Sequence, residues 1–104
     1  MSARSFAGAV TDRGLAVQVL EVASSVPEEG KGDLAIAKYK ELIRRFPRSR
    51  YADQAQFMIG YIHDLSGRKD EAIAAYKAVI ETYPNSDLAD DARVSIANID
   101  KPLE

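Results

Sequence analysis

The fold is decided by residues 53–86, DQAQFMIGYIHDLSGRKDEAIAAYKAVIETYPNS. Apolar side chains recur at helical spacing on both sides of Ser66-Gly67, and Pro84 closes the stretch. Glycine at a turn and proline just beyond a periodic run both indicate the end of a helix. The stretch is therefore predicted to form two amphipathic helices, at about 51–65 and 71–83, with Asp70 as the N-cap of the second.

The same signals recur on both sides of this stretch. Upstream, Asp33 is expected to cap a helix that runs to residue 46, and Ser49 is placed to cap the helix after it. Downstream, a last helix is predicted at 88–100. Residues 12–26 also have a helical period, with Thr11 or Asp12 as cap, but their β-branched composition keeps a strand open as an alternative.

Two parts of the chain are related by an internal duplication. Residues 33–64 laid over residues 70–101, a shift of 37 positions, give 14 identical pairs among 32. In the first copy the identical residues are Asp33, Ala35, Ile36, Ala37, Tyr39, Lys40, Ile43, Pro47, Ser49, Ala52, Asp53, Ala55, Ile59 and Ile62. Such repetition of helical hairpins predicts an all-α stack of antiparallel helices, about five in number.

Composition sets the remaining limits. The chain has 104 residues, which suits one domain, and its 16 acidic and 14 basic residues give a formal net charge of −2. With this balance, the chain as a whole lacks the excess of basic residues that indicates binding to nucleic acid or a membrane surface. Cysteine is absent, and the apolar runs are far shorter than the roughly 20 residues that span a bilayer. We interpret Leu103-Glu104 as an expression-vector remnant on a domain cut from a longer protein.

Residues 53–86 resemble the tetratricopeptide repeat (TPR), a helix–turn–helix unit of 34 residues. Ile59-Gly60 take the place of the leucine and small residue of its first helix. Ala72 and Tyr76 match the small and aromatic positions of its second helix, and Pro84 matches its closing proline. The chain departs from the pattern at Val79, where alanine is usual, and at Gln56, where tryptophan is usual; Phe57 is expected to compensate.

The resemblance implies a short right-handed TPR-type solenoid in a single domain at 12–101. Its repeats would be about 16–49 and 53–86, with a terminal half-repeat at about 88–100. Residues 1–11 are expected to be poorly ordered, and 102–104 to be a tail.

The turns between repeats, FPRSRYADQA at 46–55 and YPNSDLADDA at 83–92, resemble one bacterial branch of the TPR family. This cell-envelope branch includes the outer-membrane β-barrel assembly lipoprotein and the periplasmic Tol–Pal coordinator. The resemblance implies the bacterial envelope or periplasm, with the cytoplasm left open, so the localisation stays unknown.

No residue pattern points to catalysis. His63 is the single histidine, with Asp64 and Asp70 close in sequence, but no second nitrogen or thiolate ligand accompanies it. We interpret it as a surface residue. The chain has no nucleophile elbow, phosphate-binding glycine loop or HExxH sequence. We therefore predict no enzyme activity, no metal and no cofactor.

Three residues near the helix contacts are given structural roles. Gly60 is expected to let two helices pack closely, at a helix-propensity cost of about 1 kcal/mol. Tyr39 and Tyr76 are expected to be core aromatics whose hydroxyls reach the edge of the core.

Four arginines crowd the turn between the first two confident helices: Arg44, Arg45, Arg48 and Arg50. They fit either a solvated helix end or a patch for an anionic partner or lipid headgroup, and the lack of interleaved aromatics argues against nucleic acid. Asp87, Asp90 and Asp91 lie at the matching turn, so the basic turn of one molecule could meet the acidic turn of another.

The resemblance also implies a binding surface, because the first helix of each TPR lines the concave face of the solenoid. That face would carry Val17, Leu20, Ser24, Gln54, Phe57, Tyr61, Asp64, Asp91, Val94 and Asn98. The basic and asparagine-rich carboxylate clamp of some TPR domains is absent. The predicted function is therefore a non-catalytic module that binds a peptide or helix in an apolar groove, anchored by Phe57 and Tyr61.

The alternative is a structural or self-association segment of a longer TPR array, with no groove of its own. In that case the exposed ends of the solenoid would stack on a neighbour or form a homodimer. Neither alternative includes direct insertion into a membrane.

Overall fold

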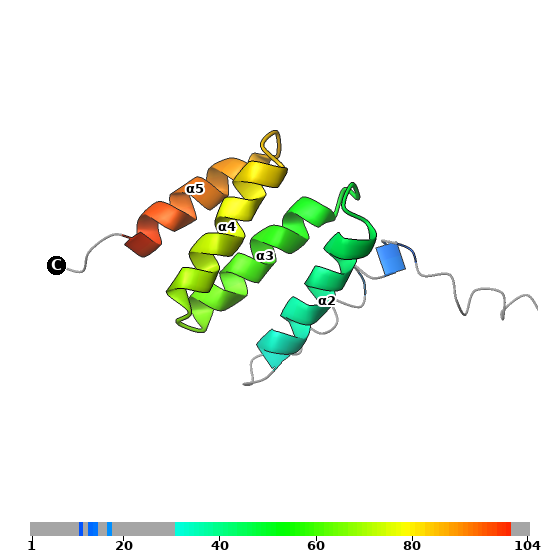
Figure 1. The fold of residues 1–104 in the computed structure, drawn as a ribbon, viewed down its shortest axis with the longest axis horizontal. Coiled ribbons are helices and arrows are strands. Elements are labelled where there is room, and N and C mark those ends of the chain that lie inside the picture. The colour runs from blue at the N-terminus through cyan, green and yellow to red at the C-terminus, as the bar shows by residue number, and fades with distance from the viewer. Residues whose placement is uncertain (1–10, 12, 15–16, 18–30, 101–104) are drawn as a thin grey trace, which may run out of the picture.

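The computed structural model describes residues 11, 13–14, 17 and 31–100. This part of the chain forms four helices and no strand: α2 (Lys31–Arg45), α3 (Ala52–Leu65), α4 (Lys69–Thr82) and α5 (Asp87–Asp100). They lie side by side in chain order and alternate in direction (Figure 1). The prediction of an all-α, TPR-type stack of helical hairpins is confirmed.

The two predicted ends of the chain, 1–11 and 102–104, fall almost entirely outside the described residues, as does most of the predicted helix at 12–26. Arg13, Gly14 and Val17 are helical. The backbone N–H of Gly14 donates to Thr11 Oγ1 at 3.0 Å, which is the bond expected of an N-cap. The helical alternative is thus the one seen at the start of this segment.

The turn between α3 and α4 is closed by a Schellman motif. The Arg68 N–H donates to the His63 carbonyl at 2.9 Å, and the Gly67 N–H donates to the Asp64 carbonyl at 3.1 Å. Gly67 has a φ of 80°, a left-handed conformation that glycine adopts without steric cost. The motif explains why Ser66-Gly67 ends the helix, as the sequence predicts.

Three predicted helix caps are wrong, and two of them are the aspartates Asp33 and Asp70. α2 begins at Lys31, so Asp33 lies inside its first turn. α4 begins at Lys69 with Arg68 as its N-cap, so Asp70 also lies in a first turn. A carboxylate in the first turn still stabilises a helix, because it faces the positive end of the helix dipole.

The turns before α3 and α5 have the same hydrogen bonds. The N–H of Tyr51 donates to Ser49 Oγ at 3.1 Å, and the N–H of Leu88 donates to Ser86 Oγ at 3.0 Å. The N–H groups of Ala52 and Ala89 donate to the carbonyls of the same two serines, both at 3.0 Å. Ser49 therefore organises the turn before α3 rather than capping the helix with its side chain, since Tyr51 is the N-cap. The duplication seen in the sequence is thus repeated in the backbone.

Among the described residues, the core consists of two clusters that meet at the α3–α4 hairpin. One joins α2, α3 and one residue of α4: Ala35, Ile36, Tyr39, Leu42, Ala52, Ala55, Ile59 and Ala75. The other joins α4 and α5 through Ala72, Tyr76, Val79 and Ala92, with Phe57 of α3 packed against it. The prediction that Tyr39 and Tyr76 are core aromatics is confirmed.

Gly60 of α3 lies against Tyr76 of α4. A Cβ atom added there would lie 2.7 Å from Cδ1 and 2.8 Å from Cε1 of Tyr76. Real Cβ atoms do not approach ring carbons so closely, so only glycine fits this contact. The predicted packing role of Gly60 is confirmed.

Gln56, which replaces the usual tryptophan, is bonded to the next helix. Its Nε2 donates to the carbonyl of Ala75 at 3.1 Å. Beside it, Phe57 packs on Tyr76 with ring centroids 5.1 Å apart and ring planes tilted by 50°. A polar bond and an aromatic pair together hold α3 to α4 at this level.

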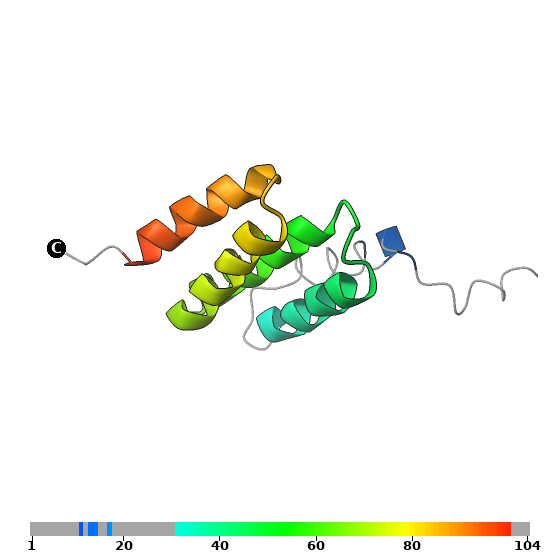
Figure 2. The same ribbon diagram turned by 45° about the horizontal axis from the view of Figure 1, so that its top comes forward.

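The helices are arranged in two layers. Turning the ribbon by 45° places α3 and α5 on one side and α2 and α4 on the other (Figure 2). α3 also contacts α5 directly, although α4 lies between them in the chain. The first helices of successive hairpins, α3 and α5, therefore share one layer, and the predicted binding residues at 54–64 and 91–98 lie on these two helices.

Candidate partner-binding surface

The predicted binding residues form one row on each of two neighbouring helices. On α3 they are Gln54, Phe57, Tyr61 and Asp64, and on α5 they are Asp91, Val94 and Asn98. Spacings of three and four residues place each row on a single helix face. Leu20 and Ser24 lie outside the described residues. Val17, which is described, is helical and exposed.

Large apolar side chains are exposed along these rows. Tyr61 is 43% exposed and Val94 is 59% exposed, and Leu65, one turn beyond Tyr61, is 70% exposed. The other large exposed hydrophobics of the described residues are Val17 and Leu34. Three of these five were predicted to line the groove, whereas Leu34 lies on α2 in the other layer.

Phe57 is half-buried and lies beneath this surface rather than projecting from it. Its ring packs on Tyr76 and against the cluster that α4 forms with α5. Phe57 therefore belongs to the floor of the surface, and Tyr61 is the aromatic residue that stands out from it.

Tyr76 of α4 brings the two rows together. Burial raises the pKa of its hydroxyl, and the carboxylate of Asp64 and the nearby Tyr61 raise it further. A hydrogen bond with Ser95 lowers the pKa of the Tyr76 hydroxyl. The Tyr76 hydroxyl is thus close to both α3 and α5, which also contact each other directly. We call the two rows together the α3–α5 face.

Ser95 is a residue of this face that sequence reasoning missed. A half-buried serine in a mostly exposed helix resembles any solvated polar residue in a sequence pattern. Its hydrogen-bond partner is Tyr76, which is distant in the chain, and nothing in the sequence marks the two residues as partners. Only the packing of α5 on α4 brings the two hydroxyls together.

The charges on the α3–α5 face are acidic. Asp64 and Asp91 are exposed there, and none of the predicted lining residues is a lysine or arginine. A partner that fits would combine apolar side chains with basic ones at its margin.

The family comparison addresses the same hairpin. Residues 54–86 match the tetratricopeptide repeat. The matched stretch covers most of α3, the turn with Gly67, all of α4 and the closing turn. No curated protein and no solved structure shows significant similarity to the chain. The TPR is typically a non-catalytic protein-interaction module, so the match supports protein binding as the general role.

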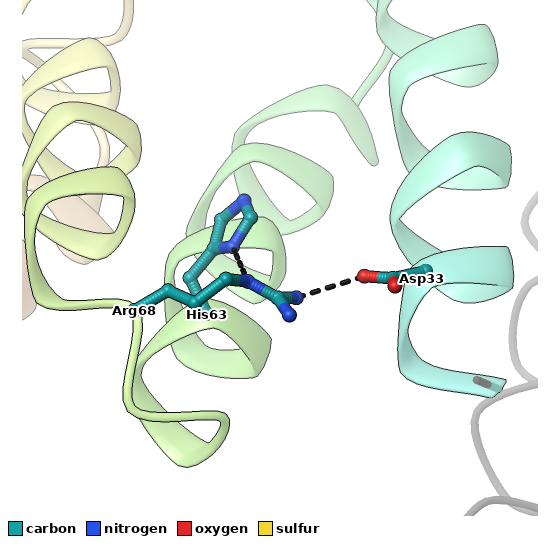
Figure 3. Close-up of polar contacts among 3 residues, drawn as sticks. All are labelled: Asp33, His63 and Arg68. Atoms are coloured by element: carbon teal, nitrogen blue, oxygen red, sulfur yellow. Dashed lines mark hydrogen bonds and ion pairs between the residues drawn. The ribbon is translucent and has the colours of Figure 1, made fainter. Parts of the chain in front are cut away.

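His63, in the last turn of α3, differs from its prediction as a surface residue. It is half-buried rather than a free surface residue. Arg68 Nε donates to His63 Nδ1 at 3.0 Å, and Arg68 Nη2 pairs with Asp33 Oδ1 at 2.8 Å (Figure 3). The three side chains link α2 to the turn of the TPR hairpin. This is a structural contact between neighbouring hairpins. Within the described residues, no group of three or more His, Cys, Asp or Glu side chains could hold a metal ion.

This link predicts a pH-dependent stability. The pKa of His63 lies below 6.5 because of burial first, then because of the positive charges of Arg68 and Lys40; Glu71 and Asp33 oppose the shift. The folded chain therefore binds a proton at His63 less readily than the unfolded chain. Stability from this residue is complete above the unfolded pKa of about 6.5 and falls as the pH drops toward the lower folded pKa.

Thermal melts at about pH 7.5 and pH 5.5, on either side of the unfolded pKa, measure this effect. We expect the melting temperature of the wild type to fall more on acidification than that of His63→Gln, because glutamine does not titrate. An equal fall in both proteins would show that His63 contributes nothing to the pH dependence.

None of the helices in the described part of the chain is both long and apolar enough to cross a membrane.

Proposed function

We propose that the chain is a non-catalytic protein-interaction module that binds an apolar helix or extended peptide on the α3–α5 face. Tyr61 and Val94 are the anchors, Leu65 extends the surface, and Phe57 supports it from below. The general role rests on the TPR match at 54–86. The face itself rests on one observation, the exposed apolar row of two adjacent helices in one layer.

The packing supports this assignment. The remaining large apolar residues of α3 and α5 are buried or half-buried in the two core clusters. Tyr61, Leu65 and Val94 are therefore surplus to the core, and exposed apolar patches rimmed by polar residues are typical of interaction sites. Gln54, Asp64, Asp91 and Asn98 supply that polar rim.

A peptide-display selection tests the proposal, with Tyr61→Ala/Val94→Ala as the variant. Both residues are exposed, so the variant should fold with a stability close to the wild type. Selected peptides should carry apolar residues at helical or alternating spacing with flanking basic residues. We expect the variant to bind them more weakly by about 2 kcal/mol or more, since anchor residues contribute on this scale.

Leu34→Ala is the matched control, because Leu34 is an exposed apolar residue of the other layer. It should bind the selected peptides like the wild type. If the Tyr61→Ala/Val94→Ala variant also binds them like the wild type, the α3–α5 face is not the binding surface.

Self-association is a second candidate function, favoured by Leu88, Ile96 and Ile99, which remain only half-buried on the last described helix. A second copy or a further repeat covering them would complete their burial. Light scattering over a range of concentrations separates the two functions: a stable monomer that binds peptide supports the first.

The finer assignments are proposals of the same kind. We propose repeats at about 16–49 and 53–86 and a half-repeat at about 88–100, supported by the equivalent turns at Ser49 and Ser86. The turn sequences also support a place in the bacterial cell-envelope branch of the family.

A further inference from the structure

A groove of about 720 Å³ runs between the two inter-repeat turns. Both turns lie at the same edge of the helix row, at the top in Figure 1. The groove is lined by Pro47, Arg48, Ser49, Arg50 and Asp53 on one side and by Thr82, Tyr83, Pro84, Asn85 and Ser86 on the other. None of these residues belongs to the exposed rows of the α3–α5 face.

The two walls of the groove are held together by hydrogen bonds between the turns. The hydroxyl of Tyr83 donates to the carbonyl of Pro47 at 3.1 Å. The hydroxyl of Ser86 donates to Asp53 Oδ2 at 2.6 Å. The groove therefore lies between two turns that are bonded to each other, and not between two independent loops.

The charge of the groove is unbalanced. Both oxygens of Asp53 already accept hydrogen bonds, from Ser86 and from the backbone N–H of Gln54 at 2.8 Å. Arg48 and Arg50 are exposed, and neither forms a salt bridge with any described residue. The Arg50 guanidinium lies 5.7 Å from the centre of the Tyr51 ring, which restrains its position. Two guanidinium groups are thus presented at one wall.

We propose that this groove binds an acidic peptide segment of a protein partner. Asp or Glu carboxylates of the segment would pair with Arg48 and Arg50, since guanidinium binds carboxylate through two parallel hydrogen bonds. The exposed rings of Pro47 and Pro84 and the exposed amide of Asn85 would contact the peptide backbone between those carboxylates. This surface is additional to the α3–α5 face.

The shape and charges favour a peptide over other anionic partners. An open groove that spans two turns is longer than a single phosphate requires. The carboxylate of Asp53 lines the groove together with Arg48 and Arg50. Arg45 is already paired with Glu41 at 3.3 Å. A lipid surface calls for a denser basic cluster, of about four to eight lysines and arginines without such acids.

The test is a titration of the ¹⁵N-labelled full chain with a hexaglutamate peptide, followed by NMR. We expect saturable shifts at the amides of residues 48–50 and 85–86. Arg48→Glu/Arg50→Glu should weaken binding about tenfold or more, because two attractive pairs become repulsive. Raising the salt from about 50 to about 500 mM should weaken binding to the wild type as well.

Two controls make the result specific. Lys69→Glu/Lys77→Glu changes the net charge by the same amount at exposed positions of α4, and should leave binding within about twofold of the wild type because these charges lie outside the groove. Tyr61→Ala/Val94→Ala should also bind hexaglutamate normally, so failure of the groove and failure of the α3–α5 face are separate results.

Four outcomes would overturn the proposal. One is equal binding by the wild type and Arg48→Glu/Arg50→Glu when both are folded by circular dichroism. Another is shifts confined to the α3–α5 face. A third is binding of inorganic phosphate or phosphatidylglycerol vesicles in place of the peptide. The last is dimerisation of the free chain that buries the groove against a second copy.

Discussion

Tyr76→Ala is expected to destabilise the fold by about 3–5 kcal/mol, the usual cost of removing a fully buried aromatic ring. Tyr76 is 1% exposed and is the largest fully buried side chain of the described residues. Its ring contacts Phe57 and lies against Gly60, so alanine leaves a cavity between α3, α4 and α5. Small domains are stable by only about 5–15 kcal/mol, so much of the total would be lost.

Urea denaturation followed by circular dichroism measures this loss. Tyr61→Ala is the matched control, because it makes the same chemical change at a tyrosine that is 43% exposed on the neighbouring helix. It should cost well under half as much as Tyr76→Ala. Similar losses for the two variants would mean that Tyr76 does not fill the space between the three helices.

Gly60→Leu is the second large expected effect, a destabilisation of about 1–3 kcal/mol or more from overpacking. Even the first side-chain carbon would lie 2.7 Å from the ring of Tyr76. That ring is buried and cannot swing into solvent, so α3 and α4 would have to separate. The gain in helix propensity on replacing glycine is about 1 kcal/mol, which is too small to offset this separation.

Ala97→Leu provides the matched control for Gly60→Leu. The 37-residue repeat places Ala97 of α5 at the position equivalent to Gly60, and Ala97 is exposed. Leucine at Ala97 should therefore change stability by less than about 0.5 kcal/mol. If thermal melts show equal effects at the two positions, the closeness of α3 and α4 at Gly60 does not limit the side chain there.

The hairpin architecture could be predicted from the sequence because its signals are local. Helical period, the Ser66-Gly67 break and Pro84 together mark the two helices of the repeat, and each of these acts within a few residues. The close packing at Gly60 could also be predicted, because the repeat pattern places a small residue there. That the ring of Tyr76 is its partner is seen only in the structure. The 37-residue duplication then carried the same architecture to α2 and α5.

The helix caps were predicted less well, because the free N–H groups at a helix N-terminus can be satisfied in several ways. Asp33 and Asp70 both suit an N-cap by residue type, yet each lies in a first turn. Asp33 pairs instead with Arg68, 35 residues away in the chain. No local rule distinguishes a carboxylate that caps its own helix from one that reaches a neighbouring turn.

The sequence predicted which residues of α3 and α5 share the binding face. The structure adds how far each side chain is buried. Phe57 and Tyr61 look alike on a helical wheel, but Phe57 packs on Tyr76 and the cluster that α4 forms with α5, whereas Tyr61 is exposed. The groove between the turns had no sequence signal beyond its arginines. Its walls depend on Tyr83 bonding to Pro47 and Ser86 bonding to Asp53, pairs that are 36 and 33 residues apart.

The matched turns at Ser49 and Ser86 set the unit in which this molecule can change length. Both turns use the same serine bonds to the residues that follow, and they lie 37 residues apart. A duplication or deletion of 37 residues therefore joins one turn to the equivalent one and keeps a serine where each of these bonds forms. A change by a number of residues that is not a multiple of 37 would move the serine out of its turn and shift the apolar face of each later helix. The addition or removal of whole 37-residue units is thus the least disruptive way for such a chain to lengthen or shorten its surface.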